Sequence, residues 1–328
     1  MTLLRFNQIT NFTESELDAL IVSGISTIQT FLFKEASSIS KSTSIDIKKI
    51  KANQAKLYEY YSTPAVNFSI FWQELTTKRC TYSTGCNKLD EMIDGGIYSG
   101  EITSIMGDSC SGKTQFVHHM AVQMATQEKD VIYIDTDGSF SAERLSQMYD
   151  ETYSLMDKET ILEKIHVTQI FGLYNLLSVL DKLTEELKSK PDGSYNEVKL
   201  IILDSYSNPF VDVLDYHSNN QRGWNHAKKQ SLLSIISAYN RALRTIVMNR
   251  PDIALITTNL DLKFAERLWH NNCGLIVNIE KIDSDIREIS CVQSERVNQL
   301  NCCRVKIDKS GFTDHIELNQ PDIGPNEI

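Results

Sequence analysis

Residues 101–125 read EITSIMGDSCSGKTQFVHHMAVQMA. An apolar segment suited to a strand comes first, and apolar residues at helical spacing come last. Between them the pattern GxxxxGK[ST] occurs once in the chain, and strand, loop and helix in this order are what a phosphate-binding P-loop requires. The loop consists of Gly107, Asp108, Ser109, Cys110, Ser111, Gly112, Lys113 and Thr114. We therefore predict a nucleoside triphosphate site within an α/β fold.

The residue types in the loop suit phosphate binding. Glycines let the backbone curl so that successive N–H groups point at phosphate oxygens, and the following helix N-terminus favours the anion. Lys113 is expected to reach the outer phosphates, and the Thr114 hydroxyl to ligate magnesium. Asp108 is unusual because a carboxylate repels phosphates, so we expect it to point outward. ATP with Mg²⁺ is the expected ligand.

Strand and helix patterns alternate from residue 81 onward, which indicates an α/β fold with a largely parallel twisted sheet flanked by helices. Strands are predicted over 101–107, 130–135, 165–170, 198–204, 252–258, 274–280 and 301–307. Helices are predicted near 113–127, 141–149, 173–189 and 226–248. The run LIILD, which ends at residue 204, is continuously apolar up to its aspartate, as buried parallel strands are.

Two aspartates at strand ends are candidates for the chemistry. Asp204 closes the run LIILD and suits a magnesium-orienting role through water, with an ordinary strand-terminal turn as the alternative. Asp137 follows the strand at 130–135 and could polarise the attacking water. Its short side chain could instead leave it too far from the phosphates.

The segments around the core define the domain plan. Residues 1–60 show helical spacing and predict a small all-α N-terminal domain, followed by a core over 81–320 and a flexible tail over 321–328. Residues 61–80 form a connector that is apolar for a linker. Its large apolar residues either pack on their own domain or dock on a neighbouring subunit. They are Phe68, Phe71 and Trp72.

Composition narrows the class of protein. The chain of 328 residues has ordinary globular usage, with 41% hydrophobic and 23% charged residues. It has no apolar run of membrane-spanning length and no signal-peptide pattern, so we expect a soluble intracellular protein. Seven cysteines without a CxxC pair predict neither a disulfide framework nor a zinc site.

The charge balance bears on nucleic-acid binding. The net charge of −10 means that any DNA contact must be local or shared with partners. One basic cluster lies between residues 41 and 56, either as a solvated helix face or as a weak phosphate-binding surface. It comprises Lys41, Lys48, Lys49, Lys51 and Lys56.

The run STGCNKLDEMIDGGIYSGEITSIMGDSCSGKTQ (83–115) resembles the opening of the core domain in RecA-like eukaryotic recombinases. Further matches are YIDTDGSFSAERL (133–145), LIILDSYS (200–207), ITTN (256–259) and RVKID (304–308), so the resemblance covers nearly the whole chain. Within the family the chain is most similar to the paralogue branch, and there to the D-type paralogues. The resemblance implies a RecA-type P-loop ATPase core and nuclear work in homologous-recombination repair.

The resemblance also implies partners. D-type paralogues assemble with sister paralogues of the B and C type and with the short cross-complementing paralogue. They support the main recombinase filament on single-stranded DNA rather than exchanging strands themselves. No membrane is involved.

Further nucleotide-site residues follow from the resemblance. Gln115 matches the family's glutamine after Gly-Lys-Thr. Arg144 matches the arginine that packs on the adenine, with a solvated helix arginine as the alternative. Asn259 sits where the family has a polar residue that senses the γ-phosphate; the alternative is a helix cap or turn.

Two DNA-facing loops are implied as well. The first spans about 211–226, with Arg222 as its best basic residue, although acidic residues make its DNA role doubtful. The second, about 260–273, carries two basic residues and an aromatic that could stack on a base. The alternative is a loop packed against the core. The three residues are Lys263, Arg267 and Trp269.

Departures from the family pattern weaken the catalytic expectation. Active recombinases carry glutamate where this chain has Asp137, which retracts the carboxylate by about 1 Å, an error that can cost about 100-fold in rate. We therefore expect weak or partner-dependent ATP hydrolysis. The segment 304–311 lacks the family's proline, which puts a contact to a neighbour's nucleotide in doubt. The alternative functions are an active strand-exchange ATPase and a RecA-fold ATPase of the signalling or clock type.

Overall fold

The computed structural model describes residues 10–25, 27–61, 67–153, 157–189, 195–211, 226–259, 269–297 and 301–315. The chain divides into two compact units, Met1–Trp72 and Gln73–Ile328. Each has its own hydrophobic core: one cluster in the N-terminal unit, and one on each face of the main sheet in the larger unit.

The N-terminal unit is helical. It contains α2 (Glu14–Val22), α3 (Ile28–Phe33), α4 (Ala36–Thr43) and α5 (Ile47–Tyr61). Thr13 caps α2 through a reciprocal capping box with Glu16, which satisfies backbone N–H groups that a helix start leaves unpaired. Apolar side chains of all four helices meet in one core, as their spacing predicts, although α4 itself is not evident from the sequence pattern. The core includes Leu17, Leu20, Ile28, Phe31, Ile39, Ile50 and Leu57.

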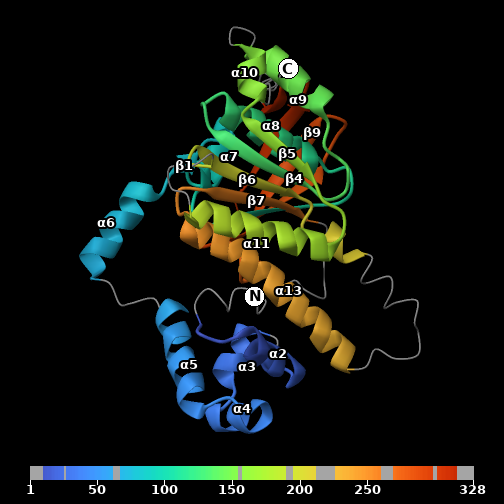
Figure 1. The fold of residues 1–328 in the computed structure, drawn as a ribbon. Helices are drawn as coiled ribbons and strands as arrows, with labels where there is room; N and C mark the ends of the chain where they lie inside the picture. Colours follow the sequence, from blue (N-terminus) through green and yellow to red (C-terminus); the bar gives the residue numbers. More distant parts are fainter. Residues whose placement is uncertain are drawn as a thin grey trace, which may run out of the picture. The chain divides into compact units, whose positions relative to one another are not determined.

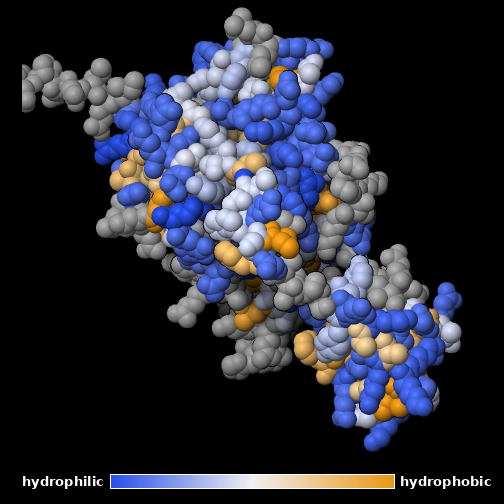
Figure 2. All heavy atoms as spheres, turned by 90° about the vertical axis from the view of Figure 1, so that its left-hand side faces the viewer, coloured by the Kyte–Doolittle hydropathy of each residue, from blue (hydrophilic) through white to orange (hydrophobic). Residues whose placement is uncertain are grey.

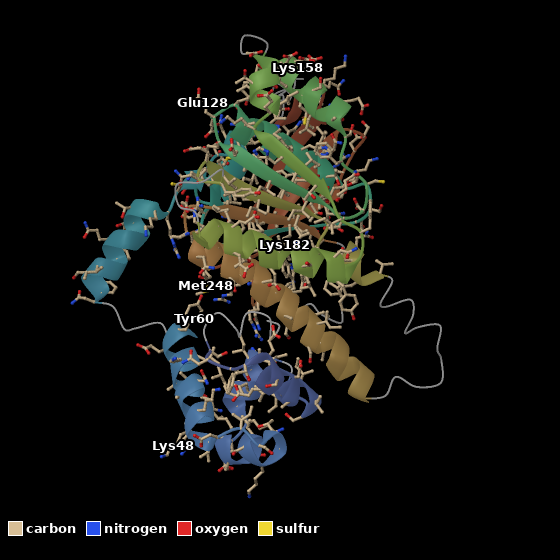
Figure 3. All side chains as sticks on the ribbon, in the orientation of Figure 1. Lys48, Tyr60, Glu128, Lys158, Lys182 and Met248 are labelled. Carbon is tan, nitrogen blue, oxygen red and sulfur yellow. The ribbon has the colours of Figure 1, made fainter. Side chains whose placement is uncertain are left out.

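The basic cluster lies mostly on α5. Lys41, Lys48, Lys51 and Lys56 are exposed, and Lys48 projects outward from the helix (Figure 3). The Nζ atom of Lys49 instead forms an ion pair with Glu16 Oε2 at 2.7 Å. This arrangement is that of a solvated helix face.

The larger unit is built on a nine-stranded sheet, counted within the described residues. Its strands in spatial order are β11 (Gly311–Asp314), β10 (Cys302–Asp308), β9 (Ile286–Ser294), β8 (Leu275–Lys281), β3 (Ile102–Met106), β7 (Ala254–Asn259), β6 (Val198–Asp204), β4 (Asp130–Asp135) and β5 (Ile165–Gln169). From β8 to β5 all neighbours are parallel. From β8 to β11 they are antiparallel. A second, two-stranded sheet pairs β1 (Thr81–Tyr82) with β2 (Ile97–Tyr98).

Helices cover both faces of the sheet (Figure 1). One face carries α7 (Asn87–Met92), α8 (Lys113–Ala125), α9 (Ala142–Thr152) and α10 (Lys158–Leu162), and the other carries α11 (Leu173–Ser189) and α13 (His226–Asn249). The predicted doubly covered α/β sheet is thereby confirmed. Among the described residues, no helix has the length and apolar character needed to cross a membrane.

Candidate nucleotide-binding site

The P-loop connects β3 to α8 along a path that only glycine allows at two positions. Gly107 and Gly112 have φ values of 146° and 115°, a region that residues with a side chain rarely adopt. A Cβ atom on Gly107 would lie 2.4 Å from Ile279 O on β8. The loop backbone therefore passes directly against the neighbouring strand, and its curl is fixed from behind.

Lys113 begins α8 and folds back over the loop. Its Nζ atom donates to Gly107 O at 2.8 Å and to Asp108 O at 2.7 Å. Burial lowers the pKa of Lys113, while the nearby Asp204 and Asp108 oppose that change. Asp108 itself is exposed, in agreement with the expected outward direction. The charged Lys113 ammonium group therefore lies against Gly107 and Asp108, the first two residues of the loop.

The rest of the loop combines exposed and buried polar groups. Ser109 and Cys110 are exposed. Ser111 is buried, and its Oγ atom has no hydrogen-bond partner among the described residues. Thr114, half-buried in the first turn of α8, also makes no hydroxyl hydrogen bond within the described part of the chain. The half-buried Thr114 hydroxyl is therefore available to a ligand at this loop.

Asp204 lies at the end of β6, in register with Asp135 at the end of β4. Its carboxylate is buried and accepts hydrogen bonds from three hydroxyl groups. Tyr133 OH donates to Asp204 Oδ2 at 2.7 Å and Ser139 Oγ to the same atom at 3.2 Å, while Thr258 Oγ1 donates to Asp204 Oδ1. Since a carboxylate offers about four acceptor positions, roughly one is left for a metal-bound water.

Tyr133 and Thr258 were missed by sequence reasoning. Tyr133 points inward from β4 and Thr258 lies near the end of β7, on either side of β6. Burial raises the pKa of Tyr133, so its hydroxyl stays protonated and donates to Asp204. Each of the three residues lies near the carboxyl end of a predicted strand, but the sequence does not show that these strands are neighbours.

The turn after β4 carries Asp137 and is organised by the buried Asp135. Asp135 Oδ1 accepts from the backbone N–H groups of Asp137 at 3.2 Å and Gly138 at 2.8 Å. Asp137 itself is exposed, and its Oδ1 accepts only from Ser139 N, at 3.1 Å, among the bonds of the described residues. Partial burial raises the pKa of Asp137, and the nearby Asp204 adds to the effect.

Asn259 ends β7 beside β3 and is 3% exposed. Its Nδ2 donates to Ser104 Oγ at 3.2 Å, and its Oδ1 has no partner among the described residues. A buried amide oxygen without a hydrogen-bond partner fits a residue that accepts a hydrogen bond from a ligand or a bound water. The strand-end position is not that of a helix cap, and the alternative of a turn falls on residues outside the described part of the chain.

Arg144 on α9 is fixed at the entrance of the site. Its Nε donates to Gln115 Oε1 at 2.7 Å, and its Nη1 to Lys309 O at 3.0 Å in the turn between β10 and β11. Nη2 donates to Asp308 O. These bonds fix the orientation of the guanidinium group, whereas the alternative interpretation expected a solvated arginine. Asp308 and Lys309 of the segment 304–311 thus contact Arg144 of their own chain.

The structure corrects the expected DNA-stacking role of Trp269. The ring is 3% exposed, its Nε1 donates to Ser104 Oγ at 2.9 Å, and its centroid lies 3.8 Å from that of Tyr206. A ring packed in the core cannot stack on a base, so the packed-loop alternative describes Trp269. The basic residues expected to face DNA lie outside the described residues. They are Arg222, Lys263 and Arg267.

The apolar connector residues lie on a helix, α6 (Phe68–Lys78). The side chains of Phe68 and Trp72 are 73% and 57% exposed, and their rings stack at 5.9 Å. The side chain of Phe71 lies outside the described residues. Figure 2, which views the molecule from the side on which Figure 1 draws α6, shows hydrophobic residues in small separate groups on a largely hydrophilic surface.

A second set of contacts holds α8 through the side chain of His119. His119 Nε2 bonds to Thr84 O at 2.9 Å, and Phe312 N donates to His119 Nδ1 at 3.4 Å. Thr84 O is only an acceptor, so the proton resides on Nε2 and the ring is neutral. Burial lowers the pKa of His119, which favours that neutral form. Gly311 has no room for a side chain, since a Cβ would lie 2.5 Å from His119 Nδ1.

Together these residues fit magnesium–ATP. The P-loop amides and Lys113 would hold the phosphates, and Thr114 and Asp204 would hold the ion. Within the described residues no group of three or more His, Cys, Asp or Glu side chains could bind a metal alone. Mg²⁺ typically takes one or two protein ligands and completes its shell with phosphate and water.

Three features define a P-loop ATPase core of the RecA type. They are a P-loop between strand and helix, an aspartate that ends the strand two positions along the sheet, and helices on both faces of the sheet. The Rad51 family model matches residues 77–262, more than half of the chain. The chain belongs to the Rad51 family.

Individual relatives agree. The chain is 24% identical over 262 residues to the DNA repair protein RAD51 homolog 4 of Bos taurus, covering 79% of this chain and 77% of that protein. It is 28% identical over 207 residues to the Mus musculus protein of the same name, covering 62% and 63%. It is 30% identical over 216 residues to the meiotic recombination protein DMC1 of Saccharomyces cerevisiae, covering 62% and 60%. These similarities support a role in recombinational DNA repair.

Proposed function

We propose that this chain is the ATP-binding subunit of a recombinase-paralogue complex that supports recombinase filament assembly on single-stranded DNA. Membership of the Rad51 family supports the repair pathway. The finer assignment to the D-type paralogues is supported by the chain length, by the run from PAVN (64–67) through WQEL (72–75) to STG (83–85), and by relatives named RAD51 homolog 4. A nuclear location follows from work on chromosomal DNA.

The observation that carries the proposal is the contrast within the site. Lys113 and Asp204 are each held by several hydrogen bonds, whereas Asp137 is exposed and shorter than the glutamate of active recombinases. Binding needs the first group and hydrolysis needs the second. We therefore expect Mg²⁺ and ATP to be bound tightly and hydrolysed slowly, or only when partners are present.

The proposed partners are the B- and C-type paralogues, the short cross-complementing paralogue and the main recombinase filament. Phe68 and Trp72 expose large apolar surface on α6, which suits docking on another subunit. A net charge of −10 weakens DNA binding by the isolated chain. Full affinity for single-stranded DNA is therefore assigned to the complex.

Co-purification with the three sister paralogues tests this proposal. The wild-type chain should form a complex that binds single-stranded DNA more tightly than the chain alone, and ATP hydrolysis should stay slow without partners. The triple variant Phe68→Ser, Phe71→Ser, Trp72→Ser should lose assembly, whereas a control triple of Lys48, Lys51 and Lys56 to Ser should keep it. Robust strand exchange by the isolated chain would instead identify an active recombinase.

A further inference from the structure

Arg287 is a buried cation that sequence reasoning did not single out. It lies on β9, opposite Lys281 of β8 and Val305 of β10, and is 7% exposed. Its Nε donates to Ser111 O of the P-loop at 2.7 Å. Its Nη1 donates to carbonyl oxygens of the turn between β8 and β9, at 2.8 Å to Asp283 O and 2.9 Å to Ile286 O.

Within the described part of the chain, Arg287 forms no ion pair with a carboxylate. All four recorded acceptors of Arg287 are backbone carbonyls. None of the ion pairs formed by described residues includes it. A buried charge without a counter-ion costs several kcal/mol even after relaxation. An anionic ligand at the adjoining loop would offset part of that cost.

The contact lies where the loop becomes a helix. Ser111 O is the last loop carbonyl before Gly112, the N-cap of α8. A Cβ on Gly112 would meet Ile307 Cδ1 at 2.7 Å and Arg287 Nε at 3.6 Å, so β9 and β10 support this peptide from behind. Turning the Ser111–Gly112 peptide would redirect the N–H groups that precede Lys113.

We propose that Arg287 is a positioning residue of the phosphate site, which fixes the Ser111 carbonyl so that the amides at the start of α8 face the phosphates, and whose charge adds to the attraction for them. The proposal rests on the proposed ATP binding at residues 107–114. It makes the antiparallel strands β8–β10 part of the nucleotide site, through a side chain that touches the loop and not the nucleotide.

Titration of the full-length chain with fluorescent mant-ATP in Mg²⁺ tests the proposal. Arg287→Met removes the charge and the donors and should weaken binding by about tenfold or more, since hydrogen bonds to charged groups contribute strongly. Arg287→Lys keeps the charge but not the fork of donors, and its affinity should lie between those of Arg287→Met and wild type. Arg304→Met, on neighbouring β10 and half-exposed, is the matched control and should bind as wild type does.

The outcomes separate the two proposals. Absence of mant-ATP binding by the folded wild-type chain would remove the proposed function and this inference with it. Wild-type affinity in a folded Arg287→Met, while Lys113→Ala abolishes binding, would overturn the role of Arg287 alone. If Arg287→Met does not fold, Arg287→Lys decides: wild-type affinity would overturn the positioning role, and several-fold weaker binding at an unchanged melting temperature would support it.

Discussion

The phosphate loop and the turn that carries Asp137 belong to the same end of the sheet but are held differently. Lys113 donates to the Gly107 and Asp108 carbonyls, Arg287 donates to the Ser111 carbonyl, and Gly107 and Gly112 lie against β8 and β10 respectively. The Asp137 carboxylate is exposed and bonds only to Ser139 among the described residues. Because rigid positioning is what catalysis requires of a water-polarising group, this difference supports the proposal that the site retains nucleotide more than it turns it over.

The largest expected effect comes from the tightly held region. Lys113→Ala removes the cation that reaches the outer phosphates and should weaken magnesium–ATP affinity on the order of 1000-fold, because two charge-assisted bonds are lost. Calorimetric titration measures this. Lys182→Ala on α11 (Figure 3) is the control and should bind normally. Unchanged affinity in Lys113→Ala would mean that residues 107–114 do not hold the nucleotide.

His118 lies on α8, which follows the phosphate loop, and contacts Phe140 near the turn that carries Asp137. Its burial should make the free energy of unfolding depend on pH. Its ring contacts Tyr133 and Phe140, each at 5.5 Å, and is 1% exposed. Burial lowers the pKa of His118 from its ordinary 6.5 to about 4. Above pH 6.5 the ring is neutral in both the folded and the unfolded chain. As pH falls from there to about 4, only the unfolded chain takes up the proton, so the free energy of unfolding should drop by about 3 kcal/mol.

Urea denaturation at a series of pH values measures this loss. His118→Phe has no titrating ring and should lose less stability between pH 6.5 and 4 than wild type. Lys182→Ala, at an exposed position on α11, should follow the wild-type curve. An unaltered acid slope in His118→Phe would show that another group governs acid stability.

A substitution in the turn that carries Asp137 should increase the rate of ATP turnover. Asp137→Glu restores the missing methylene and should raise ATP turnover by up to about 100-fold, with little change in affinity. Steady-state phosphate release in the presence of single-stranded DNA and partners is the measurement. Asp137→Asn has similar volume without the charge and should be slower than wild type. Equal rates for all three proteins would exclude Asp137 as the water-polarising group.

The smallest effect concerns the support of Asp204. Tyr133→Phe removes one of three hydroxyl donors and should raise the Mg²⁺ concentration for half-maximal ATP binding about fivefold, the value of one hydrogen bond near 1 kcal/mol. Tyr239→Phe is a matched control, because its hydroxyl is buried without a hydrogen-bond partner among the described residues. If Tyr133→Phe and Tyr239→Phe need the same Mg²⁺ concentration for half-maximal ATP binding, this would argue against a role of Tyr133 in magnesium binding.

The comparison also explains what the sequence could reveal. The P-loop and the parallel strands are local patterns of glycines and apolar runs, and each predicted strand from 101 to 307 overlaps an observed one. β9 was missed because it alternates, with its odd-numbered residues from Arg287 to Cys291 facing inward. That alternation was the one available signal that a charged residue is buried there.

Other features lay beyond local patterns. For Trp269 the resemblance left DNA stacking and a loop packed on the core as alternatives, and the partner that favours the packed loop, Ser104, is 165 positions away. The hydroxyl donors of Asp204 come from strands that become neighbours only once the sheet order is known. Long-range pairing of this kind leaves no trace in the spacing of residues.

The bonds of His119 have a consequence for the order in which the protein is made. Phe312 and His119 are 193 positions apart, and Arg287 and Ser111 are 176 apart. A ribosome therefore completes the phosphate-loop sequence long before it delivers the strands that brace it. Until β9 and β11 have been synthesised, the Ser111 carbonyl and the His119 ring lack these partners. The phosphate-loop sequence is therefore synthesised early, but these two supporting contacts can form only after residues 287 and 312 have been added.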